Sequence, residues 1–183
     1  FKLNSVTVYL IPRSEIPQLP CLLVGIKYTV TEFNLKGTPV RMSEVGRPSD
    51  SDVLLAVDIQ NDFCPGGALA VPGGDAVISI ANRLGGVFEN VVLTQDWHPA
   101  KHLSFFSSHA GKVPFDSVEM PYGRQVLWPE HCVQGSKGAD FHAGLDLPHA
   151  SLILRKGFRR EIDSYSAFFE NDGTTPTGLA GYL

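Results

Sequence analysis

A chain of 183 residues, 43% of them hydrophobic and 19% charged, is long enough for one globular domain with a real core, and this composition excludes a disordered chain. The formal net charge of −4 is spread without a long basic run, so the sequence indicates neither a nucleic acid nor an anionic membrane as a partner. No stretch reaches the roughly 18 consecutive apolar residues of a transmembrane helix.

Three cysteines, an odd number without a C-x-x-C pair, indicate neither a disulfide framework nor a zinc knuckle. They are Cys21, Cys64 and Cys132. We therefore expect a reducing, cytoplasmic setting.

Residues 1–41 form no recognisable periodic unit with the rest of the chain. Prolines interrupt their apolar stretches and Lys2 is the one positive charge at the very start, which does not fit a secretory signal. One hypothesis is that Met42 is the true start and that residues 1–41 are an upstream leader, so that the domain spans residues 42–183. The alternative is that the leader adds a genuine hairpin at the edge of a sheet.

The next segments predict an α/β fold. Residues 53–58, "VLLAVD", indicate a parallel strand buried on both faces and ending at Asp58. After a turn-rich loop, apolar residues at helical spacing predict a helix with one buried face, formed by Val77, Ile80, Ala81, Leu84, Val87 and Phe88.

Two further buried strands are predicted at residues 90–95, followed by Asp96, and at residues 151–156, ending at Lys156, with a long irregular stretch between them. Ligands of open parallel sheets bind beyond the carboxyl ends of the strands. We therefore expect Asp58, Asp96 and Lys156 to converge on one rim of the sheet.

Histidines near this rim predict a metal site. Asp96 and His98 flank Trp97, so their side chains point the same way in an extended chain. His102 follows the turn at Pro99, which could bring it back to the same ion, and a further histidine, His131, lies in "LWPEHCVQG". A carboxylate with two or three imidazoles suits a divalent transition ion such as zinc, iron(II) or manganese.

Five sequence blocks stand in order from about residue 53 to Leu183: "AVDIQNDFCPGGALAVPGG", "LTQDWHPAKHLSF", "LWPEHCVQGSKGADFH", "LRKGFRREIDSYSAFF" and "GLAGYL". Together they resemble successive blocks of the nicotinamidase/pyrazinamidase family of isochorismatase-like cysteine hydrolases. The resemblance implies an isochorismatase-like, Rossmann-like parallel sheet with flanking helices, truncated here after about three strands.

The resemblance also implies hydrolysis of nicotinamide to nicotinate and ammonia in NAD salvage, and of pyrazinamide-type amides, through a thioester. Asp58 matches the family's proton-carrying aspartate and Lys156 the lysine that favours the thiolate. Asp96, His98 and His131 match the ligands of a metal that anchors the pyridine nitrogen, and His102 matches a histidine near that metal in some members. Phe63 and Trp128 match aromatic residues that flank the ring.

The family's nucleophilic cysteine lies in a motif on a fourth strand, which we expect beyond Leu183. Cys64 and Cys132 occupy places where relatives carry cysteines besides the nucleophile. We therefore expect the 183-residue chain to be inactive as it stands, and poorly soluble because the edge of "VLLAVD" would be unpaired.

Two alternatives stay open: another amidohydrolase of the same superfamily, or a catalytically dead protein that binds a ligand or a partner. The expected partner is the small molecule nicotinamide, with no nucleic acid and no membrane, and the full-length enzyme could form a homo-oligomer.

Overall fold

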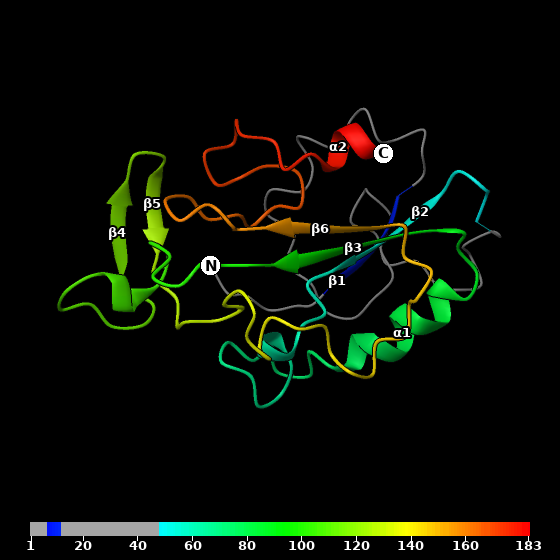
Figure 1. The fold of residues 1–183 in the computed structure, drawn as a ribbon, viewed down its shortest axis with the longest axis horizontal. Coiled ribbons are helices and arrows are strands. Elements are labelled where there is room, and N and C mark those ends of the chain that lie inside the picture. Colours follow the sequence, from blue (N-terminus) through cyan, green and yellow to red (C-terminus); the bar gives the residue numbers. More distant parts are fainter. Residues whose placement is uncertain (1–6, 12–47) are drawn as a thin grey trace.

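The computed structural model of the protein describes residues 7–11 and 48–183, and its central element is a four-stranded sheet in the order β1-β2-β3-β6 (Figure 1). The strands are β1 (Thr7–Ile11), β2 (Val53–Val57), β3 (Asn90–Asp96) and β6 (Leu152–Lys156). β2, β3 and β6 are parallel, as predicted, and β1 joins β2 antiparallel.

The aliphatic sequence of β2 places side chains in both layers of the core, because successive residues of a strand point to opposite faces. Leu54 and Ala56 pack with α1 (Ala76–Gly85), whereas Val53 and Leu55 pack on the other face with the segment from Ala167 to Leu183. That segment ends in the short helix α2 (Leu179–Tyr182), which Figure 1 shows on the side of β6 opposite α1.

The predicted helix exists, but it is shorter than expected. It ends at Gly85, and Val87, which we expected on the buried face, is 58% exposed. The chain has left the helix at that point, so helical spacing no longer decides which way a side chain faces. Ile78, which the prediction omitted, is buried instead, and Phe88 is buried from outside the helix.

The stretch between β3 and β6 is less irregular than predicted. It contains an antiparallel hairpin of β4 (Ser117–Met120) and β5 (Gly123–Val126), which lies beyond the carboxyl end of the sheet (Figure 1). The same stretch contains the short 3₁₀ turn η3 (Phe106–Ser108), whereas a second such turn, η2 (Asn61–Phe63), lies between β2 and α1. In the part of the chain that the structure describes, no helix has the length and apolar character needed to cross a membrane.

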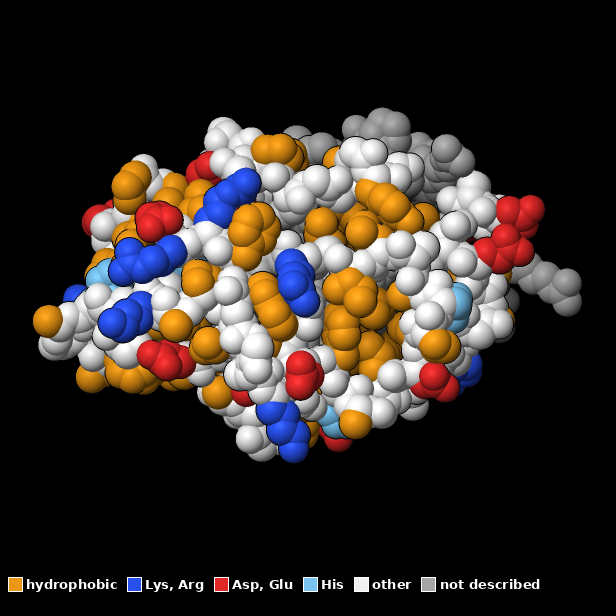
Figure 2. Space-filling model, viewed as in Figure 1, with side chains coloured by type: hydrophobic (Ala, Val, Ile, Leu, Met, Phe, Trp, Pro, Cys, Tyr) orange, Lys and Arg blue, Asp and Glu red, His pale blue; other side chains and the backbone are white. Residues whose placement is uncertain are grey.

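Basic and acidic side chains are interspersed on the face shown in Figure 2, and apolar side chains gather over the region between β6 and α1. Ile153 of β6 is about half exposed, since β6 is an edge strand of the sheet.

The expectation of an unpaired edge at "VLLAVD" is wrong in this structure. β1 pairs along all of β2, with Thr7 opposite Val57 and Ile11 opposite Val53. Part of residues 1–41 therefore adds to the sheet edge, as the alternative hypothesis for the leader allowed. Met42 and Cys21 lie outside the described residues, so the expected domain start at Met42 remains a hypothesis.

Removing β1 should make the protein aggregate, because the edge of β2 would then present unpaired backbone groups beside apolar faces. Deleting residues 1–11 should lower the monomer fraction in size-exclusion chromatography with light scattering. Deleting only residues 1–6 keeps β1 and is the matched control. Equal monomer fractions for the two deletions would contradict a protective role for β1.

Candidate metal and acid–base site

The rim of the sheet brings the three predicted charged residues together. Asp96 and Lys156 are register partners at the ends of β3 and β6, and Asp58 directly follows β2. The Lys156 ammonium lies 2.8 Å from Asp58 Oδ2 and 2.8 Å from Asp96 Oδ1, and it donates a third hydrogen bond to the Ser164 carbonyl. All three ammonium protons therefore have an acceptor.

The two carboxylates differ in charge environment. Burial raises the pKa of Asp58 above its ordinary value, and the neighbouring Lys156 opposes this without reversing it. Burial acts on Asp96 in the same direction, but Lys156 and His98 outweigh it and hold the pKa of Asp96 well below its usual range. Asp96 is therefore the permanent anion of the pair, and Asp58 is the one that accepts a proton more readily.

Asp58 has an unusual backbone conformation. Its φ is 52°, in the left-handed region that few residues other than glycine adopt, so the chain turns sharply as β2 ends. The Thr94 hydroxyl donates to Asp58 Oδ1 at 2.7 Å and fixes the carboxylate. The Asp58 side chain is 15% exposed, compared with 3% for Lys156, so Asp58 is the member of the pair that solvent or a substrate can reach.

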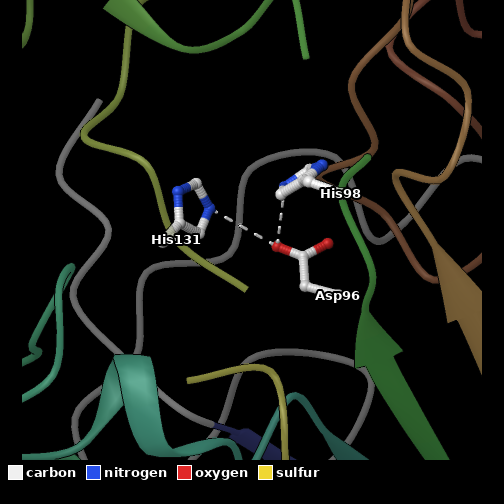
Figure 3. A group of neighbouring side chains, drawn as sticks. All are labelled: Asp96, His98 and His131. Atoms are coloured by element: carbon white, nitrogen blue, oxygen red, sulfur yellow. Dashed lines mark ion pairs between the residues drawn. The ribbon is translucent and has the colours of Figure 1, made fainter. Parts of the chain in front are cut away.

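Asp96, His98 and His131 form a compact group of metal-ligand atoms (Figure 3), as predicted. Asp96 Oδ2 lies 3.4 Å from His98 Nε2 and 3.7 Å from His131 Nε2, and all three atoms lie within 4.8 Å of one another. Two ligands about 2.0–2.1 Å from one tetrahedral zinc ion stand roughly 3.4 Å apart, so this spacing fits a metal.

The hydrogen bonds of the two histidines also fit a metal. His98 Nδ1 lies 2.8 Å from the Gly157 carbonyl and His131 Nδ1 lies 2.8 Å from the Pro129 carbonyl. A carbonyl can only accept, so each Nδ1 carries the proton and each Nε2 of the neutral ring presents a lone pair. Metal-bound histidines are commonly oriented in this way.

His98 Nε2 is a buried atom without a hydrogen-bond partner. A lone pair facing a carboxylate is unfavourable, so this position calls for a cation. Burial opposes protonation of the ring, but the charge of Asp96 overrides it and raises the pKa of His98 to about 9. Either a proton or a metal ion satisfies the contact, and the second lone pair, on His131, favours the metal.

His102, the further histidine that the sequence offered as a ligand, does not join this group. Its Nδ1 accepts from the Ser104 N–H, and its Nε2 donates to the Arg159 carbonyl at 2.7 Å. Burial, and then the nearby His98, lower the pKa of His102, so the ring is neutral with both nitrogens occupied. In this structure His102 connects the loop after β3 to the loop after β6.

Sequence reasoning missed two residues that hold Asp96 and His98 in place. The Gln60 amide accepts from the Asp96 N–H at 2.7 Å and donates to its carbonyl at 2.8 Å, so it acts as a fully buried strand partner. Gly157 has φ +64°, and a Cβ at this position would lie 2.5 Å from His98 Cε1. The only sequence signals for these two residues were the position of Gln60 just after a buried strand and that of Gly157 directly after Lys156.

The two predicted aromatic residues, Phe63 and Trp128, are both buried in the apolar core cluster that packs against α1. Phe63 meets the His131 ring edge-on, with 5.6 Å between centroids. Trp128 is buried in the same apolar cluster and donates from Nε1 to the Tyr165 hydroxyl at 3.0 Å.

Cys64 and Cys132 are buried free thiols. Burial, and then Asp75, raise the pKa of Cys64, while burial followed by Asp96 and Asp58 raises the pKa of Cys132 much further. A thiolate is thus disfavoured at both positions. That neither cysteine is the nucleophile stays a prediction.

Replacing Gly157 with alanine should weaken metal binding, since the added methyl group meets His98 and the left-handed backbone becomes strained. We expect Gly157→Ala to weaken zinc affinity by at least about tenfold, the scale on which outer-shell changes act. A chelator competition titration measures this.

Gly173→Ala is the matched control, because Gly173 has φ +69° with no atom within 4 Å of its Cβ position. It should lose stability without losing zinc affinity. Equal zinc affinity in both variants would show that the close approach of Gly157 to His98 is not required.

No family model matches the chain. The nicotinamidase of Acinetobacter baylyi is 58% identical over 137 residues, which are 75% of this chain and 64% of that protein. The nicotinamidase of Saccharomyces cerevisiae is 33% identical over 146 residues, covering 71% of this chain and 68% of the relative. This chain thus spans slightly less than two thirds of the Acinetobacter relative and slightly more than two thirds of the yeast relative.

Solved structures of nicotinamidases and pyrazinamidases are also similar to this chain in fold. The yeast nicotinamidase bound to the inhibitor nicotinaldehyde has a TM-score of 0.64 at 31% identity, with coverage of 72% of this chain and 68% of that one. The pyrazinamidase of Pyrococcus horikoshii in complex with zinc has a TM-score of 0.52 at 35% identity, with coverage of 72% and 62%.

Proposed function

Because the chain belongs to the nicotinamidase family, as 33% identity over 68% of the yeast relative shows, we propose that it forms the metal-binding and acid–base part of an enzyme that hydrolyses nicotinamide to nicotinate and ammonia. Its fold is the isochorismatase-like α/β fold of that family. The observation that carries the proposal is the Lys156 ammonium between Asp58 and Asp96, directly beside two histidine lone pairs.

Asp96, His98 and His131 hold a divalent ion in this proposal, and zinc, iron(II) and manganese are the candidates. The bound ion supplies an electrophile for the pyridine nitrogen of the substrate and so orients the ring. The Pyrococcus relative, whose structure is a complex with zinc, supports the proposal of a divalent ion. Phe63 beside His131, and Trp128 three residues before it, flank the ring.

Asp58 carries the proton. In the proposed reaction a cysteine sulfur attacks the amide carbon, its proton passes to Asp58, and Asp58 hands a proton to the departing ammonia before water cleaves the thioester. The partial exposure of Asp58 and its raised pKa support this role, because the group must both accept and release a proton. Lys156 holds the carboxylate and favours the thiolate.

The nucleophile in this proposal is neither Cys64 nor Cys132, since both thiols are buried and their pKa values are raised. We place it on a further strand beyond Leu183, as in the family motif. Pyrazinamide is a second substrate in this proposal, and we propose a cytoplasmic enzyme.

Replacing Asp58 tests the proton carrier. Residues 1–183 joined to the C-terminal remainder of the Acinetobacter relative should release ammonia from nicotinamide, and Asp58→Asn in that protein should lower kcat by about a thousandfold or more. The exposed Asp140→Asn is the matched control and should keep full activity. An Asp58→Asn enzyme within tenfold of its parent would exclude the role.

The chain of 183 residues tests the place of the nucleophile. Supplied with zinc, iron(II) or manganese, it should release no ammonia above background. If it hydrolyses nicotinamide and Cys132→Ala or Cys64→Ala abolishes the activity, the nucleophile lies within the chain and our assignment is wrong.

A further inference from the structure

A second carboxylate, Asp163, faces the metal-ligand group, and the family resemblance assigned it no role. Its Oδ1 lies 3.9 Å from His98 Nε2, the same unpartnered atom that faces Asp96. The Asp163 side chain is 4% exposed, and it comes from the loop after β6. A buried carboxylate in this position needs an electrostatic reason.

Hydrogen bonds to both carboxylate oxygens hold the Asp163 side chain in place. Oδ1 accepts the Ser164 N–H at 2.8 Å, and Oδ2 accepts from the Gln125 amide at 3.1 Å. Gln125 also donates to the Tyr165 hydroxyl at 2.7 Å, so the hairpin strand β5 and the loop after β6 hold the carboxylate together. Because both oxygens are engaged, Asp163 is kept from moving forward onto the ion.

Asp163 also lies outside the group of ligand atoms that are all within 4.8 Å of one another, although its Oδ1 is 3.9 Å from His98 Nε2. A carboxylate beside a metal site but outside its ligand group can accept a hydrogen bond from a water on the ion.

The charge balance of the rim also fits a role for Asp163. Asp58, Asp96 and Asp163, when ionised, bring three negative charges, and Lys156 brings one positive charge, so 3 − 1 = 2 negative charges remain. A divalent cation at the two histidine lone pairs makes the rim neutral. Buried charges are tolerated when they are balanced in this way.

We propose that Asp163 is a positioning residue of the metal site, which accepts a hydrogen bond from a metal-bound water and adds its charge to the attraction for a divalent cation. The inference rests on the metal site of the proposed function and deepens it. It gives the hairpin strand β5 a role, since Gln125 sets the orientation of Asp163.

Zinc titration of the 183-residue chain tests the inference. Asp163→Asn should weaken zinc affinity by about 10- to 100-fold, the usual effect of an outer-shell carboxylate, while still binding one ion. Because Asn has one accepting oxygen where Asp163 accepts from both Ser164 and Gln125, the unfolding temperature of the metal-free protein should fall. The readout specific to a positioning role is therefore the zinc affinity of the folded variant, compared with that of a control that also loses a buried carboxylate. The control is Glu170→Gln, which removes a buried carboxylate paired with Arg159 in the same loop and should leave zinc affinity unchanged.

An affinity for zinc within twofold of the wild type, or an equal loss in Glu170→Gln, would overturn the role of Asp163. Complete loss of binding, as for Asp96→Ala, would make Asp163 a direct ligand and would also overturn it. A wild-type chain that binds no zinc would instead overturn the metal site of the proposed function.

A crystal structure of the zinc-loaded wild-type chain decides between these outcomes if Asp163→Asn does not fold. A zinc-bound water hydrogen-bonded to the Asp163 carboxylate supports the inference. Direct coordination by Asp163, or a carboxylate without any contact to a zinc-bound water, contradicts it.

Discussion

The buried ammonium of Lys156 fixes the arrangement of the whole rim. Taking an ammonium out of water costs several kcal/mol, and only well-placed acceptors offset that cost. Here Asp58, Asp96 and the Ser164 carbonyl provide them, so the ends of three parallel strands and the loop after β6 must keep their register. The ion pair between Lys156 and the carboxylates is thus a constraint on geometry more than a source of stability.

The loop after β6 builds the second half of the site with backbone groups. The carbonyl of Gly157 sets the tautomer of His98, and the carbonyl of Arg159 holds His102. Ser164 accepts from Lys156, and Asp163 faces His98 from the same loop. Since the histidines after β3 and the acceptors on this loop are mutually fixed, the lone pairs of the site point inward before any ligand arrives.

Part of this site could be predicted because parallel strands end at one edge. That rule alone placed Asp58, Asp96 and Lys156 together, and alternation along an extended chain placed His98 beside Asp96. His131 was harder, since it comes from a loop whose path no local pattern reveals; the sequence offered it as one of three candidate histidines, and the family resemblance matched it to a ligand. In the structure its Nε2 lies 3.7 Å from Asp96 Oδ2, and its role as a metal ligand stays a prediction.

Other features depend on long-range packing and left little or no sequence signal. Gln60 acts as a strand partner for Asp96, and Asp163 faces His98, only because loops that are distant in sequence meet at the rim. Val87 was misplaced because helical spacing does not show where a helix ends. The pairing of β1 with β2 joins segments that share no periodic unit, and backbone pairing is compatible with many sequences.

X-ray absorption spectroscopy of the zinc-loaded chain tests the central claim most directly, because zinc–sulfur bonds of about 2.3 Å differ from zinc–nitrogen and zinc–oxygen bonds of about 2.0–2.1 Å. A site built from Asp96, His98 and His131 predicts a shell of nitrogen and oxygen atoms alone, with the scattering of two imidazoles, and its loss in Asp96→Ala. A sulfur ligand from Cys132 or Cys64, or an unchanged spectrum in Asp96→Ala, would contradict it.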